Sequence, residues 1–145
     1  RFTKVFSVDN RDFYDDYAHH PTEIRAVINS ARQVYSDRKI VCVFQPHRYS
    51  RIKSLEKEFA MSFKLSNAVV LCPVYAAGEK VDSNFSQDYF SQLISKKSGI
   101  QVINIKNQNE LKNFFKKNLF EDEIVICMGA GSISNWIRKI GTELQ

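Results

Sequence analysis

The sequence has no apolar stretch long enough to cross a membrane, and it contains little cysteine, proline or glycine. No run approaches the roughly 20 apolar residues that a spanning helix requires. No internal repeat or low-complexity segment is visible, and residues 1–10 alternate apolar and polar side chains instead of forming a secretory signal. We therefore expect a cytoplasmic protein with one domain in its 145 residues. Because Arg1 is not a natural start, we expect the chain to begin inside a longer protein.

Cysteine occurs three times, at Cys42, Cys72 and Cys127, each within an apolar run. The number is odd and the spacing fits no zinc pattern, so we expect buried, reduced thiols and no metal. The net charge of +5 comes from dispersed lysines without the stripe of basic and aromatic residues typical of nucleic-acid binding. We expect a solvated basic surface and no nucleic-acid partner.

Two catalytic signatures are also missing. The sequence contains no Gly-Lys-Ser or Gly-Lys-Thr phosphate loop and no Gly-x-Ser-x-Gly nucleophile elbow. If the protein uses ATP, the triphosphate cradle must come from elsewhere. We expect no catalytic residue in this chain alone.

What the sequence does contain is an alternation of two hydrophobic periods. Continuous apolar runs predict buried strands, and the amphipathic stretches between them predict helices. This alternation favours a doubly wound, Rossmann-like α/β domain: a mainly parallel sheet with helices on both faces. Strands are expected over 13–17, 39–45, 68–74, 100–105 and 123–128, helices over 21–35, from 50 or 51 to 63, 86–95, 109–119 and 133–144, and an edge strand or linker over 2–8. Among the inward-facing helical residues we expect Val34 and Leu55.

Polar residues cluster directly after the predicted strands. They occupy 15–20, 46–51, 75–79 and 129–132. Ligands of open α/β sheets bind beyond the carboxyl ends of the strands, so we expect these segments to share one rim.

The first of these segments carries Asp15, Asp16, His19 and His20. A carboxylate at a strand end can hold ribose hydroxyls, and together with histidine it could bind a metal. Alternatively, Asp15, Asp16 or Thr22 caps the helix that follows or its entry turn.

The second segment carries Arg48 and Arg51, three residues apart at a predicted helix start. Positive charge there opposes the helix dipole, which indicates an anionic ligand held by guanidinium forks. The alternative is an exposed basic turn. The Gly129–Ser132 segment could likewise approach an anion closely or form only a tight turn, and Ser134 replaces the last glycine of the dinucleotide fingerprint.

Three motifs in this order resemble a known family. Asp-Asp-Tyr-Ala-His-His-Pro-Thr-Glu-Ile (15–24), Phe-Gln-Pro-His-Arg-Tyr-Ser-Arg (44–51) and Val-Tyr-Ala-Ala-Gly-Glu (74–79) are similar to the C-terminal domain of the amino-acid-adding muramyl ligases. The resemblance spans nearly the whole chain and is strongest to the alanine-adding branch; the branch that recycles muramyl tripeptide fits less well. One departure is Ser132, which stands where the family has aspartate, and we assign it no role.

The resemblance implies that 1–10 is the tail of a central domain or a linker and 11–145 the C-terminal domain. It implies an ATP-dependent ligase in which the carboxylate of UDP-N-acetylmuramate is phosphorylated and the amine of L-alanine attacks the acyl phosphate. The central domain would supply the phosphate loop and the Mg²⁺ ligands, so this chain alone would be inactive. By the same resemblance, Arg1, Asp16 and His19 face ATP, while Tyr17, His47, Arg48 and Arg51 face the substrates.

Three other classes remain as alternatives. A non-catalytic nucleotide-binding module would share the fold. A phospho-receiver would need an aspartate after the third strand, where 72–75 reads Cys-Pro-Val-Tyr. A metal hydrolase would be built on the side chains of Asp15, Asp16, His19, His20 and His47.

Overall fold

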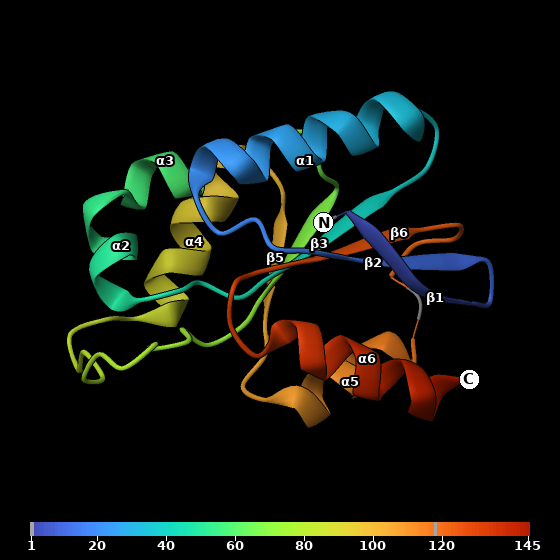
Figure 1. The fold of residues 1–145 in the computed structure, drawn as a ribbon. Helices are drawn as coiled ribbons and strands as arrows, with labels where there is room; N and C mark the ends of the chain where they lie inside the picture. Colours follow the sequence, from blue (N-terminus) through green and yellow to red (C-terminus); the bar gives the residue numbers. More distant parts are fainter. Residues whose placement is uncertain (1, 118) are drawn as a thin grey trace.

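The buried strands of this chain form one six-stranded sheet between two layers of helices (Figure 1). The computed structural model describes residues 2–117 and 119–145. The strand order is β1-β2-β6-β3-β4-β5; only β1 is antiparallel to its neighbour. The strands are β1 Thr3–Val8, β2 Arg11–Asp16, β3 Ile40–Phe44, β4 Ala68–Leu71, β5 Gln101–Asn104 and β6 Ile124–Met128. Every residue of β3, β4 and β6 is buried, as a parallel sheet covered on both faces requires.

The helices divide between the two faces of the sheet, as Figure 1 shows. They are α1 Pro21–Val34, α2 Tyr49–Ser54, α3 Glu56–Ala60, α4 Gln87–Ser98, α5 Gln108–Phe115 and α6 Ile133–Leu144. Apolar residues of α1, α2, α3 and α4 pack in one core cluster, and those of α5 and α6 pack in the other. Within the described residues, no helix has both the length and the apolar content to span a bilayer. The α/β class expected from the hydrophobic periods is confirmed.

Strand order creates a switch point at the carboxyl end of β6. This last strand lies between β2 and β3, and Met128 at its end is level with both Asp16 and Phe44. The chain leaves β2 and β3 toward one face of the sheet and leaves β6 toward the other (Figure 1). Such a divergence opens a crevice where ligands of doubly wound sheets bind.

One continuous helix was predicted up to residue 63, but the structure has two short helices there, α2 and α3. The chain turns at Leu55, whose φ of −123° separates α2 from α3, and Leu55 is only partly buried. The turn brings Phe59 and Phe63 against Phe44, with ring centroids 5.6 and 5.4 Å away. Packing on the sheet therefore takes precedence over a straight helix.

One inward-facing prediction is also wrong. Val34 is 70% exposed, because it lies at the margin of the buried stripe of α1. The predicted helix over 109–119 ends at Phe115 in the structure, and Asn118 lies outside the described residues. Residues 2–8 supply the edge strand β1. All three cysteines are buried and free, as expected.

Candidate functional site

The ends of β2, β6 and β3 are joined by main-chain hydrogen bonds at the switch point. The Gly129 N–H donates to the Asp16 carbonyl at 3.3 Å, and the Gln45 N–H donates to the Met128 carbonyl at 3.0 Å. The three loops that follow therefore start from one rigid base. A Cβ on Gly131 would lie 2.6 Å from the Cδ2 atom of Tyr75, so the loop after β4 closes on the same place.

Gln45 fixes the start of α6. Its side chain is 2% exposed; Nε2 donates to Ser132 Oγ at 2.9 Å, and Oε1 accepts from the Ile133 N–H at 3.1 Å. The N–H that opens α6 thus already has a partner, and Gly129–Ser132 is a tight strand-to-helix turn. Sequence reasoning missed Gln45; its signal was a polar residue ending the apolar run of β3.

The side chains of Asp15 and Asp16 have different partners, because neighbouring strand residues face opposite sides of a sheet. Asp15 Oδ2 accepts from Ser134 Oγ and from Arg138 Nη1, both at 2.6 Å, which ties β2 to α6. Asp16 is 5% exposed; Oδ1 accepts from the Ala18 N–H at 2.8 Å, and Oδ2 has no partner. Asp16 also lines a cavity of about 200 Å³ beside α1.

The N-cap of α1 is His20 and not Asp15, Asp16 or Thr22, whereas Asp16 caps the entry turn, because its Oδ1 accepts from the Ala18 N–H. The Thr22 N–H donates to His20 Nδ1 at 3.2 Å. Glu23 Oε1 accepts from the N–H groups of His19 and His20, both at 3.1 Å, which completes a capping box. With His20 in this role, the Oδ2 atom of Asp16 has no hydrogen-bond partner.

A row of rings connects the loops along the rim. Centroid distances are 5.3 Å from Tyr17 to His19, 5.5 Å from His19 to His47, and 5.6 Å from His47 to Tyr75. The structure thus brings together Tyr17, His19 and His47, three of the predicted site residues. Tyr75 joins them from the segment 75–79, which was expected at this rim although no role was assigned to Tyr75 itself.

The surroundings of His47 favour the neutral form of its imidazole. Burial lowers the pKa of His47 from its usual value, and the neighbouring His19, Arg51 and Arg48 lower it further, against the opposing effect of Glu79. Its Nδ1 atom is buried and has no hydrogen-bond partner. A neutral imidazole can offer this nitrogen as a donor or an acceptor.

The two arginines of the second motif differ in their surroundings. Arg48 precedes α2 as its N-cap residue with a φ of +72°, so the helical spacing assumed between Arg48 and Arg51 does not apply. The Arg51 side chain is half-buried, and its Nη1 atom is buried without a partner. An anion is already present beside them, because Glu79 accepts from the Ser50 N–H at 3.2 Å and from the Ser50 hydroxyl.

Unpartnered buried polar atoms concentrate at this rim. Six such side-chain atoms occur in the described part of the chain: Asp16 Oδ2, His47 Nδ1, Arg51 Nη1, Arg11 Nε, Arg11 Nη1 and Glu123 Oε2. The last three belong to one buried ion pair, whose Arg11 and Glu123 lie 3.8 Å apart. Because buried polar groups are nearly always bonded, the three rim atoms point to ligand groups that complete them.

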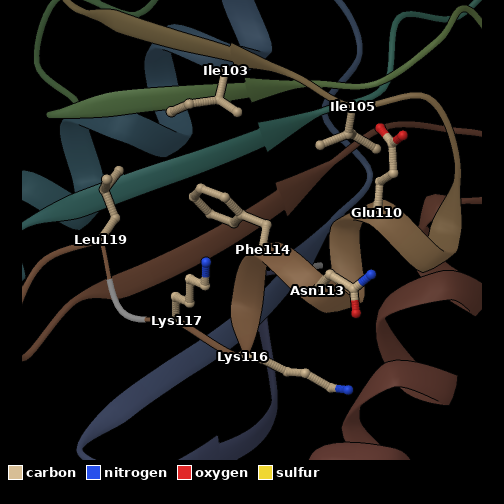
Figure 2. A pocket seen from close by; sticks show the side chains of 8 residues that line it. All are labelled: Ile103, Ile105, Glu110, Asn113, Phe114, Lys116, Lys117 and Leu119. Atoms are coloured by element: carbon tan, nitrogen blue, oxygen red, sulfur yellow. The ribbon is translucent and has the colours of Figure 1, made fainter.

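The geometry does not support a metal hydrolase at this rim, and a further cavity of the molecule lies beside the edge strand β5. Across residues 2–117 and 119–145, no three His, Cys, Asp or Glu side chains gather into a possible metal site. A cavity of about 740 Å³ lies elsewhere, between β5 and α5, and Figure 2 shows its lining from Ile103 to Leu119. The remaining predicted site residue, Arg1, lies outside the described residues.

Comparison with known proteins gives a consistent result. Residues 1–131 match the family described as Mur ligase, glutamate ligase domain. The chain is 47% identical over 140 residues to the UDP-N-acetylmuramate–L-alanine ligase of Pelagibacter ubique (strain HTCC1062), covering 97% of this chain and 30% of that protein. It thus spans under a third of the length of the curated relatives it matches.

Solved structures share the fold. The UDP-N-acetylmuramate-alanine ligase of Thermotoga maritima superposes with a TM-score of 0.74 at 28% identity, covering 99% of this chain and 29% of that one. A murein peptide ligase of Psychrobacter arcticus superposes with a TM-score of 0.76 at 15% identity, with the same coverage. The second likeness is one of fold alone.

Proposed function

The chain belongs to the Mur ligase family as its glutamate ligase domain, and we propose that it is the C-terminal domain of an ATP-dependent ligase that adds L-alanine to UDP-N-acetylmuramate. The observation that carries this proposal is the set of unpartnered buried atoms on Asp16, His47 and Arg51 at the switch-point rim. These atoms supply an acceptor, an imidazole nitrogen and a guanidinium donor, which suit a ribose hydroxyl and an amino-acid carboxylate.

In this proposal the chain binds and orients ligands, while the phosphoryl chemistry takes place on groups brought by the rest of the protein. The carboxylate of UDP-N-acetylmuramate takes the γ-phosphoryl group of ATP. The amine of L-alanine then attacks the acyl phosphate, and inorganic phosphate leaves. Holding the amine close to that carbon replaces a bimolecular encounter by a positioned one, which is a large part of the acceleration available to such enzymes.

Each rim residue has a role in this arrangement. Asp16 Oδ2 accepts hydrogen bonds from the ATP ribose, with His19 beside it. Arg51 Nη1 donates to the alanine carboxylate, a charge-assisted bond of the strong kind. His47 presents a neutral nitrogen to the same ligand, and Tyr17 and the exposed Arg48 border the substrate side.

Residues 1–10 are proposed as the tail of a central domain or a linker, and 11–145 as the C-terminal domain. Within that tail or linker, residues 3–8 form the edge strand of the same sheet, and the pairing of Thr3 with Asp15 starts this strand at the ligand rim. Arg1 is proposed to reach ATP. The central domain is proposed to bring the phosphate loop and the Mg²⁺ ligands, and the parent protein to act in the cytoplasm in peptidoglycan synthesis, and so in cell shape and division.

The muramyl-tripeptide recycling ligase is a less favoured alternative. A protein of the murein peptide ligase type shares the fold at only 15% identity, whereas the curated relatives at 34–47% identity are named alanine ligases. Phosphate release by the full-length parent protein separates the two. With UDP-N-acetylmuramate, magnesium and ATP, we expect L-alanine to give the fastest release in a panel of amino acids. Release that requires a tripeptide would favour the recycling ligase, and no release with any substrate would favour a non-catalytic nucleotide-binding module.

A further inference from the structure

Helix α2 begins without stabilising groups of its own. Its N-cap residue, Arg48, makes no side-chain capping bond, and its first turn contains no acidic residue. A helix N-terminus carries partial positive charge, and Arg48 and Arg51 add two full charges beside it. Negative charge from another part of the chain stabilises a start of this kind.

Glu79 supplies that charge from 29 residues further along the sequence. Oε1 accepts from the Ser50 N–H at 3.2 Å, and Oε2 accepts from the Ser50 hydroxyl. The pKa of Glu79 is lowered, first by the Ser50 hydroxyl and also by the N–H groups of Ser50 and Tyr49 and the charge of Arg48. Glu79 is therefore the anionic cap that α2 lacks.

The loop that carries Glu79 holds the same segment at a second point. The Arg48 N–H donates to the Tyr75 carbonyl, and the Tyr75 N–H donates to the Pro46 carbonyl, both at 2.8 Å. Ala77 and Gly78, with φ of +53° and +89°, then reverse the chain so that Glu79 returns to Ser50. Residues 46–50 are thus fixed at both ends by the loop after β4.

This clamp explains the unusual backbone at Arg48. A non-glycine residue with φ of +72° persists only where its surroundings determine it. Here the bond to Tyr75 lies on one side and the Glu79–Ser50 contacts on the other. His47 and Arg51, whose unpartnered atoms face the rim, lie within and just beyond the clamped segment.

We propose that Glu79 is a positioning residue, which holds the start of α2 through Ser50 so that His47 and Arg51 meet the carboxylate of the incoming amino acid. The inference deepens the proposed function and rests on it. Glu79 does not touch the amino acid in this proposal. Its loss should therefore weaken amino-acid binding while leaving the nucleotide end of the rim, at Asp16, undisturbed.

The test uses the full-length parent ligase with Glu79→Ala, Glu79→Gln and Ser50→Ala. For Glu79→Ala we expect the KM for L-alanine to rise about tenfold, with the KM for ATP within about twofold of wild type. Glu79→Gln keeps an acceptor for Ser50 and should show a smaller rise, as should Ser50→Ala, which keeps its N–H bond. The matched control is Glu110→Ala, because Glu110 also accepts a loop N–H, that of Lys106 at 2.7 Å, but after β5.

The outcomes separate this inference from the proposed function. Wild-type selectivity among amino acids tests the function, and the ratio of variant to wild-type KM for the preferred amino acid tests Glu79. An unchanged amino-acid KM in Glu79→Ala, or an equal rise in both KM values, would overturn the positioning role. If thermal unfolding shows that Glu79→Ala does not fold, Ser50→Ala becomes the test of the positioning role. A selective rise in its KM for the amino acid would support that role, and wild-type KM values would reject it.

Discussion

Replacing Arg51 by alanine should weaken binding of L-alanine with little effect on folding. The Nη1 atom of Arg51 is buried and unpartnered, so the wild-type fold gains nothing from a bond there. The backbone carbonyl of Arg51, which accepts from the N–H of Leu55 and the hydroxyl of Ser54, survives the substitution. Alanine is also a favourable helix residue. We expect the melting temperature to change by less than about 2 °C.

The expected loss follows from the bond that the guanidinium makes to the amino-acid carboxylate. A hydrogen bond to a charged group is worth about 1.5–3 kcal/mol, which corresponds to a loss of roughly 10- to 150-fold in kcat/KM for L-alanine. The loss should lie in KM, because the carboxylate is bound equally in the ground and transition states. Arg51→Lys keeps the charge without the fork and should fall between wild type and Arg51→Ala.

Steady-state phosphate release by the full-length ligase measures these values. Lys53→Ala is the matched control, since Lys53 is an exposed cation on the same helix. Removing Arg51 should also raise the pKa of His47, since the Arg51 charge helps to lower it. His47 should therefore take up its proton at a higher pH in Arg51→Ala than in wild type, which NMR titration of the imidazole measures. Wild-type KM values in Arg51→Ala would refute the reasoning and assign Arg51 to the solvated surface.

Two further predictions concern stability and are read by urea denaturation of the chain. Arg48→Gly should raise the free energy of unfolding by about 1 kcal/mol by relieving the positive φ, whereas Arg51→Gly, within α2, should lower it by a similar amount; shifts of the same sign would contradict this. Glu123→Gln should lower the free energy of unfolding by about 3 kcal/mol, because Arg11 stays buried without its partner, whereas joint replacement by Met and Leu should be neutral or stabilising.

The sequence predicted the elements of the fold because their signals are local. The continuous apolar runs of β3, β4 and β6 and the amphipathic spacing of α1 and α6 are visible within a dozen residues. The position of β6 between β2 and β3 has no such signal, since it depends on where α5 returns the chain. The break at Leu55 likewise follows from packing against Phe44, not from local propensity.

The same distinction applies to the site. Asp16, His47 and Arg51 could be singled out as polar residues after predicted strands. The contacts that fix their surroundings join residues far apart in sequence: Gln45 with Ile133, Glu79 with Ser50, and Asp15 with Arg138. Only the structure shows that the Asp15 carboxylate bonds to side chains of α6, whereas Oδ2 of the neighbouring Asp16 has no hydrogen-bond partner.

The central claim is that the unpartnered rim atoms bind the ligands of the ligase, and Asp16→Asn tests it most directly. Its matched control is Asp15→Asn, an identical change one residue away on the opposite face of β2. In the full-length ligase, the account predicts that Asp16→Asn raises the KM for ATP roughly tenfold with the KM for L-alanine little changed. Asp15→Asn, which weakens the contact with Arg138, should lower the melting temperature and leave both KM values near wild type. Equal KM values for ATP in the two variants would contradict the account.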